Sequence, residues 1–128
     1  MSLKGAFLYV FQVIYEELWW RIICASLIAW LWYPIAALII SSLGFGFGHW
    51  YKYKDFIKKL LGFTPPLLGP GFTWQMIVAC IPLGLLLGGL YLFGSLNWLG
   101  NIVTCVILHW IIGYLAYECN IIQKWIKE

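Results

Sequence analysis

The sequence predicts an all-α, polytopic membrane protein: a bundle of four transmembrane helices with one amphipathic helix in the membrane interface. Of its 128 residues, 63% are hydrophobic and only 10% are charged, whereas about a quarter of the residues in a soluble domain carry charge. Apolar runs of near-spanning length recur between proline and glycine breaks. Because the length suits one domain, residues 1–128 are expected to form a single transmembrane domain.

The first expected span runs from Leu3 to Trp32, where apolar residues dominate until Tyr33-Pro34. Proline disfavours a helical conformation in the residue before it and suits the first turn of the next helix. This span exceeds the roughly 20 residues that cross a bilayer, so it must tilt or project from the membrane. A shorter second span is expected from Pro34 to His49, ending in a glycine-rich stretch.

Residues 50–63 combine lysines with apolar residues at the spacing of one helix face. The apolar residues are Tyr53, Phe56, Ile57, Leu60 and Leu61, and the lysines are Lys52, Lys54, Lys58 and Lys59. This pattern predicts an amphipathic helix that lies in the membrane interface. Gly62 and the Thr64-Pro65-Pro66 run are expected to end it, and a loop follows through residue 72.

The third expected span runs from Trp74 to Phe93, with Thr73 as its N-cap. Pro82 lies within this span and is expected to kink the helix. Gly84 and Gly88 form a G-x-x-x-G motif, which lets another helix approach closely.

The fourth expected span runs from Leu96 to Cys119 and precedes a polar tail. Four spans place both termini and residues 50–63 on one side of the membrane, and all the lysines lie in these segments. The connecting segments of the opposite side carry no charge. By the positive-inside rule the shared side is the cytoplasm. We therefore expect a multi-pass integral membrane protein with cytoplasmic N- and C-termini.

The composition also bears on partners and cofactors. The formal net charge of +3 is small and no basic stripe accompanies it, so the lipid bilayer is an expected partner and nucleic acid is not. The cysteines stand singly in apolar runs and form no C-x-x-C motif, which predicts buried thiols and neither a metal site nor a cofactor. Four short spans shield a polar site from lipid only in part, so the chain is a candidate to form a homo-oligomer.

The first span contains two carboxylates and a guanidinium, those of Glu16, Glu17 and Arg21. A charge at membrane depth costs roughly 3 kcal/mol on insertion scales, so such residues usually mark a working site. Glu17 and Arg21 are four residues apart on a helix, and a purely structural ion pair is the alternative for them. The run from Glu16 to Arg21 is nevertheless the best candidate for a functional site.

Helical rise places both histidines near this cluster. From the turn between the first two spans, Glu17 lies as many residues back as His49 lies forward, so both are roughly 24 Å from the far surface. His109 lies roughly 20 Å past the start of the fourth span. Taken singly, His49 could be an ordinary interfacial histidine and His109 could simply bond a neighbouring helix. Together with Glu16, they are expected to share one polar layer.

Three motifs occur in order along the chain: Glu16-Glu17-x-x-x-Arg21, Phe45-x-x-x-His49 and a third motif centred on His109. With them the chain resembles the CAAX protease and bacteriocin-processing family (CPBP, or Abi), the glutamic intramembrane proteases that include type II CAAX prenyl endopeptidase. Residues 83–98, which lead to His109, are similar to that family's hairpin of third and fourth helices. The resemblance covers essentially the whole chain, which corresponds to the family's catalytic core.

The resemblance implies a glutamic, metal-independent intramembrane endopeptidase that acts on a peptide or protein substrate, through CAAX-type or bacteriocin and leader-peptide processing. Its implied site consists of Glu16, Glu17, His49 and His109, with Arg21, Phe45 and Gly113 in supporting positions. The last family motif ends in Asn or Asp, whereas this chain has Gly113. His109 alone, a water in the space left by the glycine, Asn101 or Tyr114 are the candidates to compensate.

A division of roles follows for the two carboxylates. Adjacent carboxyl groups in a low dielectric titrate as a coupled pair. Arg21 is expected to keep Glu17 charged and oriented, which leaves Glu16 as the general base, while His49 positions the water. By similarity to the family, His109 would donate a hydrogen bond to the tetrahedral oxyanion.

Three other function classes are also compatible with these residues. The same Glu and His side chains could bind zinc in a metalloprotease, although the H-E-x-x-H motif is absent. A non-catalytic bacteriocin-immunity or scaffold protein of the same fold is a second alternative, and Gly113 is its best argument. A small transporter is the third, because a carboxylate within the membrane can relay protons.

Overall fold

The computed structural model of the protein describes residues 2–63 and 71–127 and is almost entirely helical. In chain order the elements are α1 (Leu3–Glu17), the π-helix η1 (Leu18–Ala25), α2 (Ser26–Leu31), α3 (Pro34–Phe47), α4 (Tyr51–Leu61), β1 (Gly71–Phe72), α5 (Trp74–Phe93), α6 (Trp98–Glu118), α7 (Ile121–Trp125) and β2 (Ile126–Lys127). The expected all-helical class is therefore confirmed for the described part of the chain, apart from two strands of two residues each.

The first predicted span is one unbroken helical rod made of α1, η1 and α2. The Ser2 hydroxyl caps its start by accepting a hydrogen bond from the Gly5 N–H, and the rod ends before Tyr33-Pro34 as predicted. The π-helical section was not predicted, because sequence periodicity does not separate it from an α-helix. Such sections occur frequently at functional sites, and this one begins directly after Glu17.

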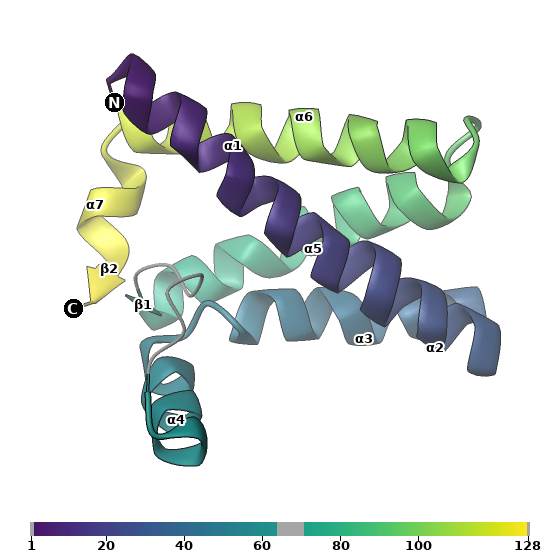
Figure 1. Ribbon diagram of the computed structural model, residues 1–128, viewed down its shortest axis with the longest axis horizontal. Coiled ribbons are helices and arrows are strands. Elements are labelled where there is room, and N and C mark those ends of the chain that lie inside the picture. The colour runs from purple at the N-terminus through teal and green to yellow at the C-terminus, as the bar shows by residue number, and fades with distance from the viewer. Residues whose placement is uncertain (1, 64–70, 128) are drawn as a thin grey trace.

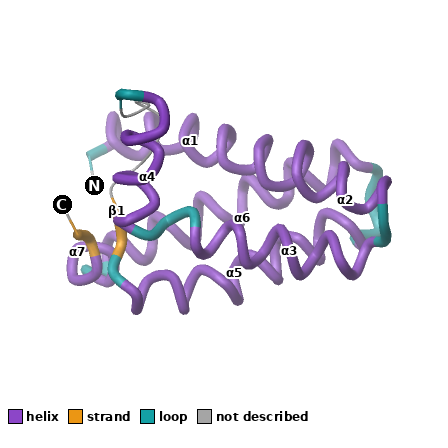
Figure 2. Tube along the Cα trace, turned by 90° about the horizontal axis from the view of Figure 1, so that it is seen from below, coloured by secondary structure: helices purple, strands orange, loops and turns teal. Residues whose placement is uncertain are grey.

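The rod crosses one face of a layer formed by α6, α5 and α3, as Figures 1 and 2 show. α1 packs on α6, η1 on α3 and α5, and α2 on α3. The α2–α3 and α5–α6 turns lie at one end of the bundle, whereas both termini, α4 and β1 lie at the other (Figure 1). This placement matches the expected arrangement of termini and connecting segments.

Glycines let α3 approach its neighbours closely. A Cβ atom at Gly44 would lie 2.6 Å from the Trp20 ring, and one at Gly84 would lie 3.1 Å from the Ser42 Cα and 3.2 Å from Phe45. The predicted role of the G-x-x-x-G motif in α5 is thus confirmed, with α3 as the partner helix. The glycine-rich stretch that ends α3 likewise allows close packing against Trp20 of η1.

The predicted amphipathic helix is present as α4, and Gly62 ends it in the left-handed conformation that glycine favours, with φ of 79°. The Thr64-Pro65-Pro66 run and the loop up to residue 70 lie outside the described residues. Thr73 occupies the N-cap position of α5, but its hydroxyl makes no capping hydrogen bond. α5 continues through Pro82, so the proline does not end the helix.

The polar tail predicted after the fourth span forms secondary structure. The left-handed residue Asn120, with φ of 60°, turns the chain after α6, and α7 and β2 follow. β2 pairs antiparallel with β1, so that Phe72 lies opposite Ile126. The β2 strand depends on backbone pairing with the distant segment β1, which the local sequence does not indicate. Two cysteines also differ from the prediction of buried thiols, because Cys119 is exposed and Cys24 is half-buried.

Among the described residues, two helices are long and apolar enough to cross a membrane, α5 with 20 residues and α6 with 21. Both agree with the predicted third and fourth spans. α3 is a shorter apolar helix. The crossing of the membrane by α3 and by the first rod stays a prediction.

Candidate active site

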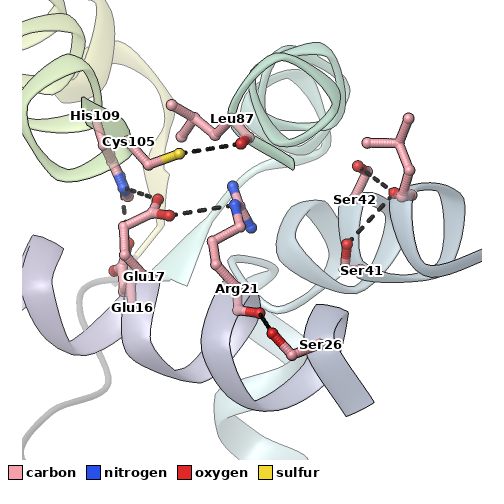
Figure 3. A network of polar contacts seen from close by, with 10 residues as sticks. Glu16, Glu17, Arg21, Ser26, Ser41, Ser42, Leu87, Cys105 and His109 are labelled. Carbon is pink, nitrogen blue, oxygen red and sulfur yellow. Dashed lines mark hydrogen bonds and ion pairs between the residues drawn. The ribbon is translucent and has the colours of Figure 1, made fainter. Parts of the chain in front are cut away.

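Two carboxylates leave the end of α1 in different directions, because adjacent residues on a helix point about 100° apart. Glu17 points into the bundle between His109 and Arg21, as Figure 3 shows. Its side chain is 0% exposed, whereas that of Glu16 is 16% exposed. Of these two side chains, therefore, only that of Glu16 is partly exposed.

Arg21 pairs with Glu17 from within the π-helix. The Arg21 Nε lies 3.2 Å from the Glu17 Oε2, and both side chains are fully buried. The pair is not aligned as a hydrogen bond. The guanidinium Cζ also lies 5.0 Å from the centroid of the Phe45 ring, within the range of a cation–π interaction. The buried charge of Arg21 is thus balanced by one carboxylate and one aromatic face.

His109, on α6, links the two carboxylates. Its Nδ1 lies 2.8 Å from the Glu17 Oε1, and its Nε2 lies 3.4 Å from the Glu16 Oε2. A carboxylate that is paired with Arg21 accepts hydrogen bonds, so the Nδ1–H of His109 donates to Glu17. This buried contact fixes the ring so that Nε2 faces Glu16.

His49 follows α3 and reaches the same carboxylate oxygen. Its Nδ1–H donates to the Phe45 carbonyl oxygen, and its Nε2 lies 3.8 Å from the Glu16 Oε2. The Phe72 ring stacks on the imidazole at 5.7 Å between centroids, and the Phe72 N–H donates to the His49 carbonyl oxygen. The orientation of His49 is thus set from two sides.

The Phe45 ring is wedged between the basic groups. Its centroid lies 4.7 Å from that of His49 and 5.5 Å from that of His109, edge to face in both cases. It is 1% exposed, so its contacts with both imidazoles lie in the protein interior. The predicted residues from the first three motifs therefore meet at one place, from α1, η1, the end of α3, and α6.

Gly113 lies one turn after His109 on α6, and the space beside it is filled. A Cβ atom built there would fall on the Tyr9 hydroxyl, with the ring atom Cζ at 2.7 Å. The residues expected to compensate for the glycine are engaged elsewhere. The Asn101 amide donates to the carbonyl oxygens of Tyr91 and Gly94 at the α5–α6 turn. Tyr114 stacks on Trp110, whose indole donates to Ala6.

Sequence reasoning missed Gln12, Tyr9 and Phe72. The Gln12 amide donates to the Glu16 Oε1 at 3.1 Å, from one turn earlier in α1. Gln12 and Tyr9 lie four and seven residues before Glu16, which is the spacing of one helix face. That spacing could have indicated both residues. Phe72 had no local signal, because its place depends on the β1–β2 pairing.

Comparison with known proteins assigns the chain to a family. A protein-family model described as type II CAAX prenyl endopeptidase Rce1-like matches residues 2–115, which include every predicted site residue. No curated protein and no solved structure matches the chain. The match supports a membrane-embedded protease and does not favour the non-catalytic alternative.

Proposed function

Because the chain belongs to the Rce1-like family of type II CAAX prenyl endopeptidases, we propose that it hydrolyses peptide bonds in the membrane with a water activated by glutamate and histidine. The proposed substrate is a peptide or protein that carries a CAAX-type C-terminus. One observation carries this mechanism: the Glu16 Oε2 lies within 4 Å of the Nε2 atoms of both histidines, 3.4 Å from His109 and 3.8 Å from His49.

These separations suit a bridging water. The 3.8 Å gap to His49 is too long for a direct hydrogen bond, and polar groups at such a distance are commonly joined through water. A general base must reach the proton that it takes directly or through one water. Glu16 meets this requirement and, unlike Glu17, is partly exposed, so a substrate can approach it.

The charges of the site residues indicate how many protons the site holds. The Nδ1 atoms of His49 and His109 each donate to an acceptor, so both Nε2 atoms and the Glu16 carboxylate face one another as acceptors. Two carboxylates and Arg21 together carry one net negative charge. One further proton, shared by Glu16 and the imidazoles, makes the site neutral, which a low dielectric favours.

The proposed reaction proceeds in two steps. Glu16 takes a proton from the water, the water oxygen bonds to the scissile carbonyl carbon, and the carbonyl π electrons move onto its oxygen. In this step the further proton of the site is on the His109 Nε2, which donates a hydrogen bond to the oxyanion and so stabilises it. The oxyanion then collapses, the C–N bond breaks, and the proton held by Glu16 passes to the leaving amine. His49 keeps the water in line throughout.

The test uses the purified chain in proteoliposomes with a fluorescence-quenched, prenylated CAAX peptide. Glu16→Gln removes the base without changing side-chain size and is expected to abolish cleavage, as is His49→Ala. Asp55→Asn is the matched control, because Asp55 is an exposed carboxylate on α4, a helix that carries none of the predicted site residues. Cleavage is expected to persist with a chelator. Full activity of Glu16→Gln would overturn the mechanism, and loss of activity with EDTA would favour zinc.

A further inference from the structure

The face of α6 that carries His109 offers no side chain at its next turn, since residue 113 is glycine. A phenol from another helix occupies that position. The Tyr9 hydroxyl lies where the Cβ of residue 113 would be, and the ring atoms Cζ and Cε1 lie 2.7 and 2.9 Å from that point. The glycine therefore makes room for a hydroxyl group supplied by α1.

Tyr9 also lies on the side of α1 that forms the site. It precedes Glu16 by seven residues, two helical turns, which places both side chains on one face. The Tyr9 side chain is half-buried. It is a phenol on the helix face of Glu16 and lies beside Gly113, one turn from His109, which makes it a candidate to act on the same reacting group.

We propose that Tyr9 is a further catalytic residue, whose hydroxyl donates a second hydrogen bond to the oxyanion that His109 also stabilises. This inference rests on the proposed peptidase function. A tyrosine O–H is a neutral donor, so it adds no charge to the balanced site. Asn101 and Tyr114 are held by other contacts, whereas the Tyr9 hydroxyl occupies the place that a side chain at position 113 would take.

The first variant removes only the hydroxyl. Tyr9→Phe keeps the ring packed against Gly113 and is expected to lower kcat on the order of 10²-fold, the usual effect of losing one oxyanion donor, with KM unchanged. Tyr15→Phe is the matched control, since Tyr15 lies on the same helix but is 45% exposed. Both variants are expected to unfold at the wild-type temperature. Wild-type kcat in Tyr9→Phe would overturn the proposal.

A second pair of variants tests the position itself. Gly113→Ala places a methyl group on the Tyr9 hydroxyl and is expected to lower kcat as Tyr9→Phe does. Combining Tyr9→Ala with Gly113→Asn supplies an amide donor at the vacated place and is expected to raise kcat above that of Tyr9→Ala alone. A double variant no better than Tyr9→Ala would contradict a donor role at this position.

The two proposals fail in different ways. If the wild-type chain cleaves the peptide and Glu16→Gln does not, but Tyr9→Phe is fully active, only the role of Tyr9 is wrong. If the wild-type chain cleaves no peptide, the proposed function is wrong, and the role of Tyr9 is overturned with it.

Discussion

The His109 Nδ1 lies 2.8 Å from the Glu17 Oε1, although 92 residues separate them in the chain. This contact joins the end of α1 to the middle of α6, and Arg21 holds the other oxygen of the same carboxylate at 3.2 Å. Glu17 therefore contacts both Arg21 and His109, whereas Glu16 lies near the Nε2 atoms of both imidazoles. These contacts support the proposed division of roles between the two adjacent carboxylates.

The Glu17–Arg21 pair gives the first prediction. Arg21→Met leaves a fully buried carboxylate without its cation and is expected to lower the free energy of unfolding by about 3–5 kcal/mol. Glu17→Gln combined with Arg21→Met removes both charges and is expected to recover most of that loss. Unfolding titrations in mild detergent measure both variants. A double variant as unstable as Arg21→Met would show that the ion pair is not the reason for the loss.

The second prediction concerns Phe45, which is wedged between Arg21 and the two histidines. Phe45→Ala removes a fully buried ring and is expected to cost about 3–5 kcal/mol of stability and most of the peptidase activity, because water then reaches the back of the imidazoles. Phe47→Ala is the control from the same helix, since Phe47 is 41% exposed. Equal losses in both variants, measured by unfolding and by cleavage assays, would argue against the wedge.

The Phe72 ring gives the third prediction, because it stacks on the imidazole of His49 at an interplanar angle of 28°. Phe72→Leu keeps an apolar side chain but loses the stacking interaction, worth about 0.5–1.5 kcal/mol. We expect an activity loss of up to about tenfold and a fall of a few degrees in unfolding temperature, as the lost interaction requires. Phe63→Leu, at an exposed phenylalanine, is expected to retain activity. Wild-type rates in Phe72→Leu would mean that the Phe45 carbonyl alone orients His49.

Local rules predicted most of the helices. Proline at position 34, glycine at position 62 and the apolar run of 74–93 mark element boundaries that the structure reproduces to within a few residues. The π-helix and the β1–β2 pair could not be predicted, because sequence periodicity does not separate a π-helix from an α-helix and the two strands lie more than fifty residues apart. Hydrophobic periodicity records neither kind of constraint.

The candidate site, too, was predicted where local sequence sufficed and was missed where tertiary contacts decide. Charges in an apolar span indicated Glu16 and Glu17, and helical rise placed both histidines in their layer. Tyr9 shares the helix face of Glu16 by its spacing, but a tyrosine in an apolar helix is typical of packing, so the spacing alone gave it no role. Its place beside α6 became known only through the space that Gly113 leaves there. The role of a glycine such as Gly113 can be inferred only when the residue packed against it from the neighbouring helix is known.

The last prediction tests the close packing of α5 on α3 that brings Phe45 to the site. A methyl group at position 84 would press on the backbone of Ser42 and on the Phe45 ring at 3.1–3.3 Å. Gly84→Ala is therefore expected to lower the free energy of unfolding by about 1–3 kcal/mol and to reduce cleavage by shifting Phe45. Gly89→Ala is the matched control on the same helix, because no atom lies within 4 Å of its Cβ position. Since alanine favours a helix over glycine by up to about 1 kcal/mol, Gly89→Ala is expected to be slightly stabilising and fully active. A gain of stability in both variants would contradict the prediction, because it would mean that α5 and α3 pack less tightly at Gly84 than these distances indicate.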